Sequence, residues 1–149
     1  MHRVYLDHLS TTPVLPEVFE AMKPYFIEAF GNPSSLHQHG LRVRDALQQA
    51  RERFAGLVNA GSSEEIFFTS GGTEANNLAV KGAAYANQRR GNHIVVNATE
   101  HPSILQSVEF LEKQGFAATK VAVDAEGAID PEAIRAAVTN RTILIAVQL

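Results

Sequence analysis

The chain has 149 residues, 45% of them hydrophobic, and a formal net charge of −3. This composition is typical of a globular domain with a core of its own, and the negative net charge does not favour nucleic acid or an anionic membrane as a partner. Cysteine is absent, which excludes disulfides, thiolate metal sites and a cysteine nucleophile supplied by these residues. We find neither a secretion signal nor an apolar run near the ~20 residues of a membrane span, and we expect a cytoplasmic protein.

The first 58 residues predict helices joined by polar loops. A short strand is expected at residues 4–6, followed by a polar loop at 7–12. A helix is expected from Pro16 to about Ala29, because its apolar residues recur on one face and proline suits a first helical turn. After the break at 31–35, a longer helix is expected over residues 36–58. We interpret residues 1–35 as an N-terminal arm with a helix and cleft loops.

From Glu65 onward, apolar runs and helical patterns alternate regularly. Strands are expected at 66–69, 94–97, 119–123 and 142–147, and helices at 73–89, 102–114 and 130–138. This alternation is typical of βαβ units, in which a parallel sheet is covered by helices on both faces. The sequence therefore predicts an α/β domain over residues 36–149.

The run from Ile66 to Asn77 reads as a short apolar strand, a glycine turn and the first turn of a helix. Gly71 and Gly72 allow backbone angles and close approaches that a Cβ would hinder, and Thr73 is able to cap the helix or bind a phosphate oxygen. The free N–H groups and the helix dipole favour an anion there. A plain strand-to-helix turn explains the glycines equally well on spacing alone. The pattern matches neither a dinucleotide fingerprint nor a P-loop.

A second candidate is His101, which lies between an expected strand and the helix that begins at Pro102. In a parallel sheet this position lies at the carboxyl edge, where ligands bind. The imidazole is able to stack on a flat ligand or to move protons. A surface histidine beside a helix-starting proline is the simpler explanation. No metal site is expected, since His37 and His39 lie at a helix start without a carboxylate partner in the sequence.

Four motifs occur in order along the chain: Tyr5–Pro13, Phe30–Ser35 with His37 and Gly40, Phe68–Ala79, and Thr99–His101. Together they resemble the motifs of the cysteine desulfurases, which are class V members of the fold-type I pyridoxal-phosphate (PLP) superfamily. The resemblance extends over essentially the whole chain. At residues 8–10, His-Leu-Ser departs from the commoner residues of the family.

This resemblance implies roles for particular residues. Gly72 and Thr73 would hold the cofactor phosphate, and His101 would stack on the pyridine ring and take part in proton transfer. The region of Asn32 would border the substrate cleft. The implied fold is the N-terminal part of the family's PLP-binding large domain, incomplete in these residues. The implied reaction converts L-cysteine to L-alanine and passes the sulfur, as a persulfide, toward iron–sulfur or thio-cofactor assembly.

The family also carries a lysine that bonds the cofactor, an aspartate for its pyridine nitrogen and a sulfur-accepting cysteine, none of which has a counterpart here. We therefore expect this chain to be one half of a split desulfurase, inactive alone and completed by a C-terminal chain. A homodimer or heterotetramer of the assembled enzyme and a sulfur-acceptor or scaffold protein are the further partners expected. The alternatives are an inactive truncated homologue or scaffold, or another class V enzyme such as a selenocysteine lyase.

Overall fold

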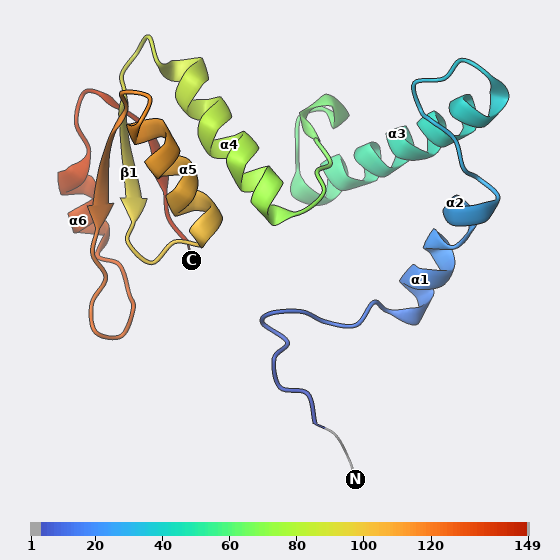
Figure 1. Cartoon of the computed structure of the whole chain (residues 1–149), viewed down its shortest axis with the longest axis horizontal. Coiled ribbons are helices and arrows are strands. Elements are labelled where there is room, and N and C mark those ends of the chain that lie inside the picture. The colour runs from blue at the N-terminus through green and yellow to red at the C-terminus, as the bar shows by residue number, and fades with distance from the viewer. Residues whose placement is uncertain (1–3, 149) are drawn as a thin grey trace. The chain divides into compact units, whose positions relative to one another are not determined.

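The computed structural model describes residues 4–148 of the chain, which divides into two compact units, residues 1–67 and 68–149 (Figure 1). The first unit is helical and the second is α/β. The division into an arm of residues 1–35 and a domain of residues 36–149 stays a prediction.

The first unit begins with irregular chain and two short helices. The strand expected at residues 4–6 is not formed, and the hydroxyl of Tyr5 donates instead to the carbonyl oxygens of Asp7 and Thr11, at 2.9 and 3.3 Å. The single helix expected from Pro16 to about Ala29 is wrong as well. It is divided into α1 (Pro16–Met22) and α2 (Pro24–Ile27), because Pro24 has no N–H to continue the helical hydrogen bonds.

The long helix of the first unit, α3 (Gln38–Val58), starts within two residues of its expected position. Its N-cap is His37, whose Nδ1 accepts a hydrogen bond from the backbone N–H of Gly40 at 3.3 Å. A Cβ at Gly40 would lie 2.4 Å from the carbonyl oxygen of Ser35, so the preceding loop can lie against α3 only with glycine there. The helix ends at Asn59, which is in the left-handed conformation and is followed by the 3₁₀ turn η1 (Ser63–Glu65).

The strand expected at residues 66–69 is not formed, which corrects the sequence prediction. These residues have no regular structure, and the aromatic side chains of Phe67 and Phe68 are exposed. An apolar run becomes a strand only when a neighbouring strand takes up its backbone N–H and C=O groups. Within residues 4–148, no strand pairs with this segment.

In the second unit, all other expected strands and helices are present, and no end differs from its expected position by more than two residues. Three parallel strands form a sheet in the order β2-β1-β3, which confirms the α/β fold class. The elements in chain order are α4 (Gly72–Asn87), β1 (His93–Asn97), α5 (Pro102–Glu112), β2 (Ala117–Val121), α6 (Pro131–Ala137) and β3 (Thr142–Ala146).

The order of the strands places helices on both faces of this sheet. The chain moves from β1 to β2 through α5, and then back past β1 to β3 through α6. Crossovers between parallel strands are right-handed in nearly all proteins, and for these two crossovers, which run in opposite directions along the sheet, that rule places α5 and α6 on opposite faces. Figure 1 shows α4 and α5 together on one side of β1, with α6 on the other. The expectation that helices cover both faces is therefore confirmed.

The core of the second unit lies between β1 and the pair α4 and α5. Alternate residues of β1, Ile94 and Val96, are fully buried on this face. The helices contribute four further buried side chains, namely Val80, Ala84, Val108 and Leu111. Within the described residues, no helix is long and apolar enough to cross a membrane.

Candidate functional site

The carboxyl edge of the parallel sheet brings the two predicted sites of the second unit together. β1 ends at Asn97, and the following loop leads through His101 into α5. On α4, one turn beyond Gly72, the side-chain Nδ2 of Asn76 donates to the hydroxyl oxygen of Ser103 at 2.8 Å. The first turns of α4 and α5 therefore lie side by side at this edge, the usual position of ligands in α/β sheets.

The glycine turn differs from the sequence expectation in how the helix is capped. Gly71 is the N-cap of α4 and no side chain caps the helix, so the suggested capping role of Thr73 is wrong. The backbone N–H of Gly72 and that of Thr73 belong to the first helical turn, where no intrahelical acceptor exists. Gly71 has an extended backbone, and a Cβ on Gly71 or Gly72 would meet no atom within 4 Å. Neither backbone angle nor internal packing therefore requires these two glycines, and the space beside them is open.

Glu74 holds this turn in shape. Its Oε2 accepts hydrogen bonds from the backbone N–H and from the hydroxyl of Ser70, both at 2.7 Å. These bonds, the hydroxyl first and the N–H second, lower the pKa of the Glu74 carboxyl from its ordinary value of 4.5. Ser70 is thus already engaged, and the N–H groups of Gly72 and Thr73 are among the donors of this turn that remain available to an anion.

His101 is the N-cap of α5 and has an ordered imidazole. Its Nδ1 accepts from the backbone N–H of Ser103 at 3.1 Å and lies 2.7 Å from the hydroxyl oxygen of the same serine. Ser103 itself is buried. Sequence reasoning missed both Ser103 and Asn76, because neither residue type marks a site by itself and their bond joins positions far apart in the chain.

A third missed residue is Glu100, whose carboxylate is buried although carboxylates rarely are. Its Oε1 accepts a hydrogen bond from the backbone N–H of Gln148, just beyond β3. The bond joins the loop after β1 to the end of β3. The buried carboxylate on this side of the site therefore has a hydrogen-bond donor and is not an isolated charge.

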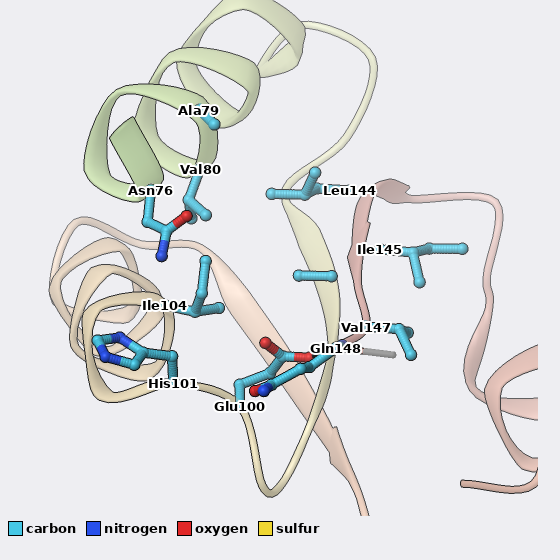
Figure 2. A pocket seen from close by; sticks show the side chains of 11 residues that line it. Asn76, Ala79, Val80, Glu100, His101, Ile104, Leu144, Ile145, Val147 and Gln148 are labelled. Atoms are coloured by element: carbon cyan, nitrogen blue, oxygen red, sulfur yellow. Dashed lines mark hydrogen bonds between the residues drawn. The ribbon is translucent and has the colours of Figure 1, made fainter. Parts of the chain in front are cut away.

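A pocket of about 460 Å³ opens beside these residues, within the range of roughly 300–1,000 Å³ of small-molecule sites (Figure 2). Figure 2 shows the Asn76 side chain directed from α4 toward the turn that carries His101, and Glu100 beside Gln148. Gly72 and Thr73 are not among the lining residues. The pocket is lined by Asn76, Ala79, Val80, Glu100, His101, Ile104 and residues 144–148.

Residues 4–149 match the aminotransferase class-V family. A curated relative, the cysteine desulfurase IscS of Dictyoglomus turgidum, is 49% identical over 144 residues. The alignment includes 97% of this chain and 36% of the relative, so the chain spans little more than a third of the length of such relatives.

Two solved structures resemble the fold closely. A NifS-like protein superposes with a TM-score of 0.90 and 34% identity, over 97% of this chain and 39% of its own. The structure of SspA in complex with cysteine superposes with a TM-score of 0.86 and 37% identity, over 95% of this chain and 40% of its own. The fold is thus part of the fold seen in these proteins, and the chain belongs to the aminotransferase class-V family.

Proposed function

We propose that residues 72–73 and His101 form one wall of the PLP site of a cysteine desulfurase. The observation that carries the proposal is the bond from Asn76 to Ser103, which holds the start of α4 against the start of α5. Two unpaired backbone N–H groups and an ordered imidazole thereby come to one sheet edge. Homologues of this chain are PLP-dependent desulfurases, and PLP is therefore the ligand that we propose for this arrangement.

The residues of this edge fit the cofactor's phosphate. The N–H groups of Gly72 and Thr73 and the Thr73 hydroxyl are donors, and the dipole of the 16-residue helix α4 favours negative charge at its start. The open space beside Gly71 and Gly72 lets an anion approach the backbone closely. When bound, PLP supplies the electron sink that the reaction requires.

The protein's own part is binding, orientation and control of a proton. We assign the phosphate to Gly72 and Thr73, and stacking on the pyridine ring together with proton transfer to His101. The apolar residues Val80, Ile104 and Leu144 of the neighbouring pocket reduce access of water to one side of the site. The substrate we propose is L-cysteine, since cysteine is the molecule found in complex with the related SspA.

Other groups of the reaction must come from outside these 149 residues. The chain has no cysteine to accept sulfur, and no lysine lines the pocket. We propose that further polypeptide, arranged as a complementary C-terminal chain, supplies the lysine and the thiol. A homodimer or heterotetramer, a sulfur acceptor and a cytoplasmic location stay predictions.

Reconstitution tests this function. We would co-express the chain with the remaining two thirds of the Dictyoglomus turgidum relative and measure sulfide and alanine formed from L-cysteine with added PLP. Turnover is expected only in the mixture, falling at least tenfold in Thr73→Ala and in His101→Ala, because each removes a contact to the cofactor. The control is Asn77→Ala, which removes a hydrogen bond to the Thr73 carbonyl and is expected to retain activity.

Two results would contradict the proposal. One is a soluble complex of the two chains that binds PLP but forms no alanine from L-cysteine, which would favour an inactive scaffold. The other is unchanged PLP affinity and turnover in both Thr73→Ala and His101→Ala, which would remove these residues from the site.

A further inference from the structure

The hydrogen bonds of His101 determine which ring nitrogen carries its proton. The backbone N–H of Ser103 donates to Nδ1 at 3.1 Å. Since an N–H only donates, Nδ1 must present its lone pair to Ser103. The neutral ring therefore carries its proton on Nε2. Within residues 4–148, the structure contains no hydrogen-bond partner for this second nitrogen.

The hydroxyl of Ser103 extends the same pattern. Its oxygen lies 2.7 Å from Nδ1 and 2.8 Å from Nδ2 of Asn76. The Asn76 amide group donates to the hydroxyl oxygen, which leaves the hydroxyl proton free to donate to Nδ1. Asn76 then donates to the Ser103 hydroxyl oxygen, and the hydroxyl and the backbone N–H of Ser103 share the single lone pair of Nδ1 as their acceptor.

Burial makes this arrangement durable. Ser103 is only 4% exposed, and Asn76 is partly buried, so water has little access to their shared hydrogen bond. A second hydrogen bond fixes the backbone of Ser103, since the hydroxyl of Ser107 donates to the carbonyl oxygen of Ser103 at 2.7 Å. A buried polar group that loses its hydrogen-bond partner is left desolvated and unpaired, which opposes rotation of the serine hydroxyl.

We propose that Asn76 and Ser103 are positioning residues that hold the His101 ring with Nδ1 against α5 and the proton on Nε2. Nε2–H is then the polar ring atom left for a ligand. The relevance to catalysis rests on the proposed role of His101, whereas the ring geometry can be tested on its own. Asn76 lies on the same first turns of α4 as Gly72 and Thr73, so one residue aligns the phosphate donors with the imidazole.

The test uses the full 149-residue chain labelled with ¹⁵N in its histidines, in mildly alkaline buffer. For His101 we expect one nitrogen signal typical of a protonated Nε2 and one typical of an unprotonated, hydrogen-bonded Nδ1. Asn76→Asp has nearly the same shape but offers the serine hydroxyl an acceptor in place of a donor. It is expected to turn that hydroxyl away from Nδ1 and to move the two ring ¹⁵N signals toward one another.

Three further variants make the outcome decisive. Asn77→Asp introduces the same charge one residue along α4 and is expected to leave the His101 signals in place. Ser103→Ala is expected to act like Asn76→Asp, while Ser103→Thr, which keeps a hydroxyl, is expected to restore the wild-type signals. A protonated Nδ1 in the wild-type chain, or equal effects of Asn76→Asp and Asn77→Asp in folded protein, would overturn the proposal.

PLP added to the complex of this chain with the complementary C-terminal chain separates this inference from the proposed function. If PLP leaves the His101 signals unchanged while the variants behave as expected, the positioning role of Asn76 and Ser103 is supported and the proposed cofactor site is contradicted. If PLP shifts the His101 signals but Asn76→Asp does not alter the ring ¹⁵N signals, the proposed cofactor site is supported and the positioning role of Asn76 and Ser103 is contradicted.

Discussion

At the scale of single residues, a carboxylate organises the glycine turn from within. Glu74 reaches back four residues and occupies both donors of Ser70, at 2.7 Å each. These bonds favour the charged form, so the pKa of Glu74 is lowered below 4.5. The stabilisation of the turn is therefore fully present above pH 4.5 and is lost as the pH falls through the lowered pKa.

This gives a prediction about acid. In the intact chain, the amide signal of Ser70 is expected to titrate with a midpoint below pH 4.5, because its acceptor is protonated there. Glu74→Gln is expected to abolish that titration, as followed by ¹H–¹⁵N spectra. Glu64→Gln serves as the control, since its side chain makes no such bond to Ser70. A Ser70 midpoint at or above 4.5 would contradict the assignment.

Some residues could be identified from the sequence, and others could not. Gly72, Thr73 and His101 were indicated by motifs, since their types suit anion binding and ring stacking. Asn76 and Ser103 were not, because their importance comes from a bond across 27 positions of the chain. The role of Glu100 likewise depends on Gln148, 48 positions away.

At the scale of elements, one glycine decides how the α4–β1 connection meets β3. A Cβ on Gly91 would lie 2.2 Å from the carbonyl oxygen of Arg141. That same oxygen accepts the backbone N–H of His93 at the start of β1. Any larger residue at 91 must therefore displace the pairing of β1 with β3.

We predict that Gly91→Ala destabilises the chain by about 1–3 kcal/mol, as an overpacked site does. The matched control is Gly82→Ala on the exposed face of α4, where an added Cβ meets nothing within 4 Å. It is expected to stabilise by about 0.5–1 kcal/mol, because alanine loses less entropy in a helix. Urea unfolding measures both, and a neutral Gly91→Ala would show that the two backbones are able to separate without cost.

The elements also show where periodicity works and where it does not. It located α5 and the three strands correctly, because each has an apolar face that must be buried. Periodicity wrongly predicted a strand at residues 66–69, because no strand within residues 4–148 lies beside this apolar run. It also missed the break at Pro24, although proline chemistry was sufficient to place it.

At the scale of the whole molecule, the two units differ in how well they bury apolar side chains. The second unit contains the clustered core of β1, α4 and α5. Among residues 4–67, the only buried hydrophobic side chains are Ala29 and Ala55. Large apolar residues of the first unit remain exposed, including Phe19, Phe26, Ile27 and Leu57.

We therefore predict different behaviour of the two units when they are expressed separately. Residues 68–149 are expected to unfold cooperatively, with the amides of β1 the slowest to exchange. Residues 1–67 are expected to retain helix α3 in part but to show no cooperative transition, because the unit has almost no core. Circular dichroism with urea and hydrogen exchange measure this. A cooperative transition of residues 1–67 would contradict this prediction, because it would show that the helices of the first unit are stable together without a larger core.

The sequence by itself determined the chemical types present, the alternation of strands and helices, the absence of a thiol and the family of the chain. These are local properties, since they depend on side-chain type and on periods of two or 3.6 residues. Only the tertiary structure decided that the starts of α4 and α5 meet, that Asn76 and Ser103 orient His101, and that residues 66–69 form no strand. Each of these depends on contacts between distant segments, which no local pattern records.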